Sequence, residues 1–386
     1  MQFVRILKYI RSKNPRFSVN IAVRSAVQTT RGNRLLSCYN ACQRRVLCLP
    51  STAQTPMPTK PSIDAVAREA GVSIATVSRV LNGTKAVSAA TRQRVESAVK
   101  ALDYRANPFG RGLSTGESRI VLMLMPDFAN PFYAEIVRGA AAVTRSAGYT
   151  LLPAGWEASS DTADRSLQML AGSLSDGVIN LMHMPDQKPW QEATHGKPWV
   201  NCSEFLAGDS EPYVSIDHRQ AAMDAVQYLI NKGHRRIGFV TTNDHFLYAR
   251  QRREGYEAAL TRAGIVPTPE LIFAMGENSY SAGSQAAAAM LAVVDPPSAV
   301  FTVSDTLAIG AIKGFRKAGR VVPGDVAVMG FDDVPIADIF EPGLTTVAQP
   351  MSDLGATAAE MLLAILGGDT ASPKILPHRL VVRQSA

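Results

Sequence analysis

The stretch Ile63-Asp-Ala-Val-Ala-Arg-Glu-Ala-Gly-Val-Ser-Ile-Ala-Thr-Val-Ser-Arg-Val-Leu-Asn-Gly83 decides the fold of the amino-terminal part of this chain. Ser62 is placed to cap a helix that stops at Gly71. Ser73 can cap a second helix, from Ile74 to Leu81. Two short helices joined by a three-residue turn that contains glycine are typical of a helix-turn-helix unit.

A third helix is expected from Ser88 to about Leu102, with a buried apolar stripe that includes Val95. The three helices predict a compact all-helical unit over residues 60–105. The pattern alone also suits any three-helix bundle of similar size. DNA binding is favoured because the second helix carries more polar side chains than packing needs, namely Thr76, Ser78 and Arg79.

From Arg119 onward, short apolar strands alternate with longer helical stretches. The expected strands are Ile120–Met125, Tyr149–Pro153, Gly177–Leu181, Pro198–Cys202, Arg236–Val240, Ala299–Val303, Val326–Gly330 and Thr346–Gln349. The expected helices are Phe132–Ala147, Asp161–Ser173, Gln220–Lys232, Arg250–Ala263, Ser281–Val294, Asp305–Ala318 and Met351–Leu366. This alternation predicts an α/β core of two doubly wound lobes, each built on a parallel sheet covered on both faces.

Charge divides the chain into three parts. Residues 1–56 hold ten Lys and Arg and no Asp or Glu, residues 57–118 hold nine against five, and residues 119–386 hold twenty-one against twenty-eight. This asymmetry indicates an anionic partner for the amino-terminal part only. The composition, 46% apolar and 19% charged, is that of a globular protein, and no stretch approaches the ~18 consecutive apolar residues of a membrane span.

The cysteines follow the same division. Cys38, Cys42 and Cys48 lie in the basic leader, and only Cys202 lies in the body. A body with one cysteine has no disulfide framework, which is typical of a reducing compartment.

Taken in order, these motifs resemble the lac-repressor family of bacterial transcriptional regulators. The resemblance covers about residues 60–386 and rests on several ordered motifs: 63–83, Pro126–Tyr133, Asp176–Ile179, Gly233–Gly238, Arg252–Gly255, Gly330–Asp333 and Leu344–Thr346. It implies a DNA-binding head, a hinge at residues 106–118, and a core at 119–386 that is similar to periplasmic sugar-binding proteins. It also implies a homodimer whose affinity for double-stranded operator DNA is set by a small molecule, a sugar or sugar derivative, bound between the lobes.

The resemblance assigns the DNA contacts residue by residue. It places Ile74, Ala75 and Arg79 at base edges, where the arginine can pair with guanine through two hydrogen bonds. Leu113 aligns with a leucine that wedges into the minor groove, although residues 107–114 would alternatively be only a flexible linker. Side chains suited to phosphate contacts are Ser73, Thr76, Ser78 and Asn82.

The effector site is expected at the carboxyl ends of strands. The resemblance assigns Arg252 and Asp332 to the effector. Side chains that follow other strands and complete the expected site are Asp127, Phe132, Tyr133, Ser304 and Asp305. Each aspartate would alternatively cap a helix. Ser203 and Asn278 stand where the family often has other residues, so the identity of the effector stays open.

Two other classes of protein fit the sequence less well. A solute-binding protein would need a secretion signal, and the leader lacks a clean apolar core of about 7–15 residues. An enzyme would need a catalytic motif, and the chain has no G-x-S-x-G elbow, P-loop, dinucleotide fingerprint or H-E-x-x-H pair. We therefore expect no enzymatic activity, no cofactor, no metal and no membrane partner.

Residues 1–56 have two interpretations. An Arg-rich, acid-free leader resembles an organellar targeting signal. Alternatively, translation starts at Met57 and the leader is upstream sequence, which the bacterial family resemblance favours. The core also ends near Ala386 without a heptad segment, so a dimer is expected rather than a tetramer.

The hinge yields the first testable prediction. Gly110 and Gly112 stand where the family usually has alanine or serine, and each glycine weakens a helix by ~0.5–1 kcal/mol relative to alanine. Replacing both with alanine should tighten operator binding, with and without effector, because less contact free energy is spent on ordering the hinge. The measurement is an operator titration at fixed salt. Unchanged or weaker binding would mean that the glycines permit a close approach to the DNA backbone.

Overall fold

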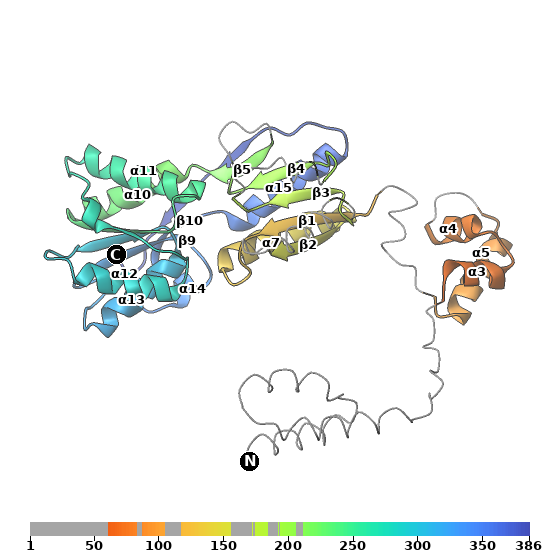
Figure 1. Ribbon diagram of the computed structural model, residues 1–386, viewed down its shortest axis with the longest axis horizontal. Helices are drawn as coiled ribbons and strands as arrows, with labels where there is room; N and C mark the ends of the chain where they lie inside the picture. Colours follow the sequence, from red (N-terminus) through yellow and green to blue (C-terminus); the bar gives the residue numbers. More distant parts are fainter. Residues whose placement is uncertain are drawn as a thin grey trace, which may run out of the picture. The chain divides into compact units, whose positions relative to one another are not determined.

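The structure is a computed structural model that describes residues 61–82, 87–104, 117–155, 174–183, 194–205 and 211–386, together with the single residues 172 and 192 (Figure 1). The chain separates into two units, Met1–Arg105 and Ala106–Ala386. The leader, the hinge up to residue 116, and nearly all of the expected helix Asp161–Ser173 lie outside the described residues.

The head contains the three expected helices, α3 (Ile63–Ala70), α4 (Ile74–Asn82) and α5 (Ala89–Ala101). Ser62 Oγ accepts from the Ala65 N–H at 3.3 Å, and Gly71 ends α3 with a left-handed φ of 63°. Ser73 Oγ accepts from the Thr76 N–H at 3.2 Å and so caps α4. The helices enclose a small apolar core of Val66, Ala67, Ala70, Val77, Val80, Val95 and Ala98.

The second unit contains the two predicted parallel-sheet lobes. The sheet of the amino-terminal lobe has the order β11-β5-β4-β3-β1-β2, and its strands are β1 (Ile120–Met125), β2 (Thr150–Gly155), β3 (Gly177–Asn180), β4 (Trp199–Cys202), β5 (Tyr213–Ile216) and β11 (Lys374–Leu376). Its described helices are α7 (Pro131–Ser146) and α15 (Met351–Leu366).

The sheet of the carboxyl-terminal lobe has the order β12-β10-β9-β8-β6-β7. Its strands are β6 (Ile237–Thr241), β7 (Ile272–Ala274), β8 (Ala299–Thr302), β9 (Ala327–Asp332), β10 (Thr345–Ala348) and β12 (Arg379–Val381). Figure 1 shows one helix pair on each face of this sheet, α10 (His218–Asn231) with α11 (Leu247–Arg262), and α12 (Tyr280–Leu291) with α13 (Asp305–Lys317). A 3₁₀ turn at Pro269–Leu271 and the short α14 (Ile336–Ile339) complete the lobe.

Four short strands were not predicted from the sequence: β5, β7, β11 and β12. Each has only three or four residues, too few to show an apolar period. β12 and β10 form the one antiparallel pair among the described strands.

The chain passes between the two lobes of the core three times, and these passages are here called the crossovers. The crossovers are residues 217, 349–350 and 377–378, each lying between an element of one sheet and an element of the other. Three crossovers restrict the lobes to opening and closing about one region, the hinge type of domain motion.

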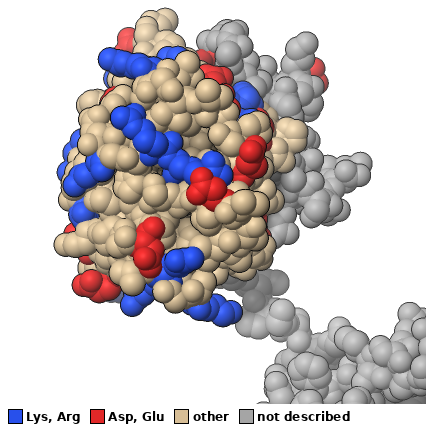
Figure 2. Space-filling model, turned by 90° about the vertical axis from the view of Figure 1, so that its left-hand side faces the viewer, with Lys and Arg blue, Asp and Glu red and all other residues tan. Residues whose placement is uncertain are grey.

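Surface charge at the outer end of the carboxyl-terminal lobe is mixed. Figure 2 shows blue Lys and Arg side chains interspersed with red Asp and Glu on this face. A mixed surface lacks the uniform basic field that attracts a DNA backbone. Among the described residues, no helix is both long and apolar enough to cross a membrane.

Glycine allows the helices to pack at very short distances. A Cβ on Gly139 of α7 would lie 1.8 Å from the Ser352 carbonyl oxygen of α15. A Cβ on Gly355 would likewise lie 1.9 Å from the Ile136 carbonyl oxygen. Helices α7 and α15, the described helices of the amino-terminal lobe, are thus in backbone contact at two reciprocal points.

We predict that Gly139→Ala lowers the free energy of unfolding by about 1–3 kcal/mol, because the methyl group meets rigid backbone and forces α7 away from α15. Urea unfolding of the full chain measures this loss. Gly276→Ala is the matched control, since a Cβ there meets no atom within 4 Å. Equal unfolding curves for the two variants would contradict the close-packing argument.

Candidate functional sites

The outward face of α4 carries the residues that were predicted to read bases. Ile74 is 46% exposed, and Ala75 and Arg79 are also exposed. Val77 and Val80 point inward and are buried, so they fix which face of the helix is free. Leu113 and the side chain of Asn82 lie outside the described residues.

The phosphate-contact candidates at the start of α4 have local roles as well. Ser73 Oγ and Thr76 Oγ1 lie 2.9 Å apart, within hydrogen-bond distance. Ser73 also caps the helix, so it positions the amino-terminal turn that a recognition helix presents to the major groove.

A second candidate site is a cavity between the two lobes, here named the interlobe cavity. Its lining comes from both lobes: Asn130, Phe132, Tyr133, Leu181, Ser203, Glu204, Tyr248, Arg252, Asn278, Val303, Ser304 and Asp332. The cavity has a volume of about 20 Å³, which is room for about one water molecule.

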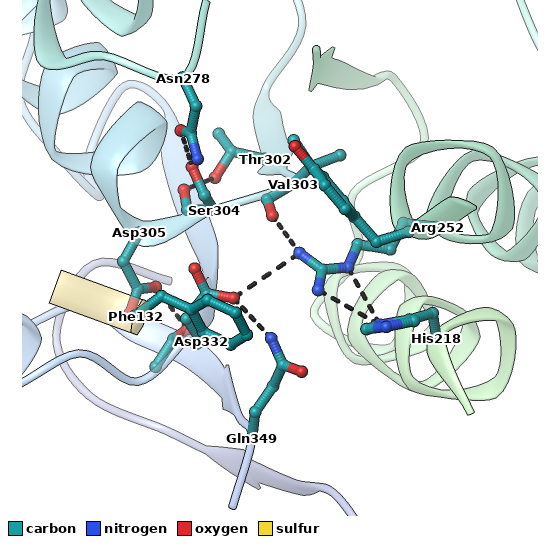
Figure 3. Close-up of polar contacts among 12 residues, drawn as sticks. Phe132, His218, Arg252, Asn278, Thr302, Val303, Ser304, Asp305, Asp332 and Gln349 are labelled. Atoms are coloured by element: carbon teal, nitrogen blue, oxygen red, sulfur yellow. Dashed lines mark hydrogen bonds and ion pairs between the residues drawn. The ribbon is translucent and has the colours of Figure 1, made fainter. Parts of the chain in front are cut away.

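Arg252 lies in this cavity and is only 3% exposed. Figure 3 shows its guanidinium among Asp332, the Val303 carbonyl oxygen and His218. Its guanidinium donates to the Val303 carbonyl oxygen and lies 3.7 Å from Asp332 Oδ1. The group also packs over the Phe331 ring, 3.6 Å from the centroid. These contacts satisfy a cation whose burial would otherwise be costly.

His218 holds Arg252 from the other side. Arg252 Nε and Nη2 lie 3.4 and 3.2 Å from His218 Nδ1, which must be the acceptor because arginine can only donate. Burial, and then the positive charge of Arg252, hold the pKa of His218 well below its ordinary value. His218 is therefore neutral, and it begins α10 directly after the first crossover.

Asp332 ends β9 in a strained backbone conformation. Its φ is 119° and that of Asp333 is 62°, values that side chains rarely adopt. Gln349, on the second crossover, donates to Asp332 Oδ1 at 2.7 Å. Burial raises the pKa of Asp332 to about 7, against the lowering effects of Arg252 and Gln349.

Asp305 does not line the interlobe cavity, although it was predicted to bind the effector. Its carboxylate accepts from Thr346 Oγ1 at 2.6 Å and from the Val334 N–H at 2.8 Å, inside the carboxyl-terminal lobe. Burial, and then the nearby charge of Asp332, raise its pKa well above the ordinary value. A structural role at the start of α13 thus accounts for this residue.

Asp127 also lies outside the lining. It is exposed, and its Oδ1 accepts from the Ala129 N–H at 2.7 Å in the turn before α7. Asn130 caps α7 by accepting from the Phe132 N–H at 3.0 Å. The predicted aromatic residues Phe132 and Tyr133 do line the cavity and meet edge to face, with centroids 5.2 Å apart.

Ser304 lines the cavity as predicted and caps α13, accepting from the Leu307 N–H at 3.2 Å. Its hydroxyl donates to Asn278 Oδ1 at 2.6 Å. The two positions at which this chain differs from the family, Ser203 and Asn278, both line the cavity.

Glu204 is the residue that the sequence analysis missed most clearly. It follows β4 in the amino-terminal lobe, yet its Oε2 and Oε1 accept from the Leu247 and Tyr248 N–H groups at 2.9 and 3.1 Å. Those groups begin α11 in the carboxyl-terminal lobe. Its place in the sequence could have indicated this role, because Glu204 follows a predicted strand, and a polar residue at the carboxyl end of a strand is expected near a ligand.

Burial raises the pKa of Glu204 from 4.5 to about 6, although the two backbone N–H groups and Arg252 act in the opposite direction. His183 Nδ1 lies 3.8 Å from Glu204 Oε2, and burial lowers the pKa of His183. Glu204 is therefore largely ionised at neutral pH and contributes a negative charge to the cavity.

A helix-turn-helix head together with a two-lobed α/β core that encloses a polar cavity defines the class of DNA-binding transcriptional regulators. Residues 62–107 match the model of bacterial regulatory proteins of the lacI family, and residues 226–386 match that of a periplasmic-binding-protein-like domain. The transcriptional repressor CytR of Escherichia coli strain K12 is 34% identical over 85% of this chain and 96% of its own length. Catabolite control protein A of Priestia megaterium is 35% identical over 83% and 97%.

Two solved structures are also similar. The lac repressor dimer bound to operator and the anti-inducer ONPF has a TM-score of 0.74 at 27% identity, covering 85% of this chain and 99% of that one. The CelR–cellobiose complex has a TM-score of 0.65 at 33% identity, covering 84% and 100%. The chain belongs to the lacI family of bacterial regulatory proteins, and the relatives named here are regulators rather than enzymes.

The raised pKa of Glu204 predicts a specific dependence of stability on pH. The folded state binds the Glu204 proton more tightly than the unfolded state, so this stabilisation is full below pH 4.5 and is lost as pH rises through 6. The free energy of unfolding of the wild type, minus that of Glu204→Gln, should fall by about 2 kcal/mol over this range. Urea unfolding of both proteins across pH measures the difference. Parallel pH curves would rule out a perturbed carboxyl group at this position.

Proposed function

We propose that this chain is a homodimeric repressor that binds two-fold symmetric operator DNA and is controlled by a small polar metabolite in the interlobe cavity. The effector is a sugar or a related polyhydroxylated molecule, and the site of action is the nucleoid in the bacterial cytoplasm. Support comes from the composition of the lining, which combines three aromatic side chains with amide, hydroxyl and carboxylate groups. The solved structures of the lac repressor dimer bound to operator and of the CelR–cellobiose complex support the same assignment.

The observation that carries this proposal is the set of hydrogen bonds that join the interlobe cavity to the crossovers between the two lobes. His218 directly follows one crossover and bonds to Arg252, while Gln349 lies on another crossover and bonds to Asp332. Arg252 and Asp332 are the two charged side chains on the carboxyl-terminal side of the cavity. A ligand that binds either charged group changes its hydrogen bond to His218 or Gln349. The angle between the two lobes changes with those contacts. Ligand binding and DNA affinity are coupled through that angle.

The experiment is a thermal-shift screen of sugars, sugar derivatives and nucleosides on the full chain, followed by operator titration with each compound that stabilises it. Binding to the native state alone raises the melting temperature. At least one uncharged polyhydroxylated compound should do so and should also change operator affinity. Stabilisation without any change in operator affinity would contradict the proposed control.

Arg79 provides the test of the DNA-binding half. Arg79→Ala should cost about 1–3 kcal/mol at one base pair of each operator half-site, because a bidentate contact to guanine is lost. Titration against operators that are substituted one base pair at a time measures this cost. A loss that is uniform over all sequences would instead make Arg79 a phosphate contact.

A further inference from the structure

We propose that the interlobe cavity selects uncharged, hydroxyl-bearing effectors, and that Glu204 is the residue that excludes phosphorylated and carboxylated ones. This inference rests on the proposed function, because it names the chemical class that the same cavity accepts. Glu204 would determine specificity from the amino-terminal lobe while it is hydrogen-bonded to α11 of the carboxyl-terminal lobe.

Three helix amino termini meet at the cavity, an arrangement that would ordinarily favour an anion. α7 begins beside Asn130, α11 begins at Leu247 next to the lining residue Tyr248, and α13 begins after Ser304. The exposed N–H groups and the dipole of a helix amino terminus attract phosphate and carboxylate groups.

Each of these termini already has an acceptor from the protein itself. Asn130 Oδ1 accepts from the first turn of α7, and Ser304 Oγ accepts from the first turn of α13. At α11 the acceptor is a full carboxylate, because both oxygens of Glu204 bond to consecutive N–H groups. An anionic ligand would have to displace Glu204 or lie beside it.

The charges of the lining point the same way. Its ionisable acidic and basic side chains are Glu204, Asp332 and Arg252, so two carboxyl groups face one guanidinium. Arg252 is already engaged by Asp332, His218 and the Val303 carbonyl oxygen. An entering phosphate would meet two carboxylates and no cation without a partner in this lining.

A hydroxyl-bearing ligand meets matching groups instead. Asp332 makes both its side-chain contacts through Oδ1, which leaves Oδ2 on the same carboxylate to accept from a ligand hydroxyl. The amide of Asn278 can donate while its oxygen accepts from Ser304. Phe132 and Tyr133 offer apolar ring surface for one side of the ligand.

The test compares matched pairs of probes on the full chain: ribose with ribose 5-phosphate, glucose with glucose 6-phosphate, and adenosine with its 5′-monophosphate. In the wild type, any pair that binds should bind through its uncharged member, with the phosphorylated member at least about tenfold weaker. In Glu204→Gln this ratio should shrink by about tenfold or more, since one carboxylate charge is removed. Equal or tighter binding of a phosphorylated member to the wild type would overturn the proposal.

A second arm needs no effector at all. Glu204→Ala leaves the Leu247 and Tyr248 N–H groups without their acceptor, so acetate or inorganic phosphate should raise the melting temperature of this variant above a chloride control of equal ionic strength. The wild type and Glu270→Ala, a change on the exposed 3₁₀ turn, should show no such gain. The same response in all three proteins, or in none, would overturn the role given to Glu204. If Glu204→Ala does not fold, inorganic phosphate binding by Glu204→Gln but not by the wild type supports the proposal, and its absence overturns it.

The two proposals fail in different ways. If the proposed function is wrong, stabilising compounds leave operator affinity unchanged. If anion exclusion is wrong, phosphate compounds bind the wild-type core, whether or not operator affinity responds.

Discussion

The burial of the Arg252 guanidinium is the constraint on which the interlobe cavity depends. A buried cation is tolerated only when its donors are satisfied, and three different elements satisfy this one: the end of β8 through Val303, the end of β9 through Asp332, and the start of α10 through His218. Those contacts fix the carboxyl-terminal half of the cavity. They also tie it to two crossovers, one that is followed directly by His218 and one that contains Gln349.

The amino-terminal half of the cavity is attached through Glu204. Its carboxylate joins the end of β4 to the start of α11, so it contacts the same helix that carries Arg252. A ligand between the lobes would lie next to this bridge, because Glu204 and Tyr248 both line the cavity. A change at this one carboxylate therefore affects both lobes.

Local signals in the sequence predicted much of this structure. The helix Met351–Leu366 agrees with its prediction at both ends, because Pro350 and Gly367 bound a long apolar stretch. Five of the predicted effector residues, Phe132, Tyr133, Arg252, Ser304 and Asp332, line the cavity. Asp305 shows the limit of such signals, because the use of a carboxylate after a strand depends on the neighbouring strands. Here Gly330 leaves space beside Asp305, and Thr346 and the Val334 N–H bind it. Glu204 could not be paired with α11 from sequence, since its partners lie 43 and 44 residues further along the chain.

The most direct test of the coupling between Arg252 and DNA affinity is operator titration of Arg252→Lys, with and without the metabolite that stabilises the wild type most. Lysine keeps the charge but cannot contact Asp332, Val303 and His218 together. Arg253→Lys is the matched control, because Arg253 is the next residue on α11 and pairs at the surface with Asp244 and Glu257. The metabolite should change operator affinity by about fivefold or more in the wild type and in Arg253→Lys, and by less than about twofold in Arg252→Lys. If the metabolite changes the operator affinity of Arg252→Lys as much as that of the wild type, this buried arginine does not link the cavity to the crossovers between the lobes.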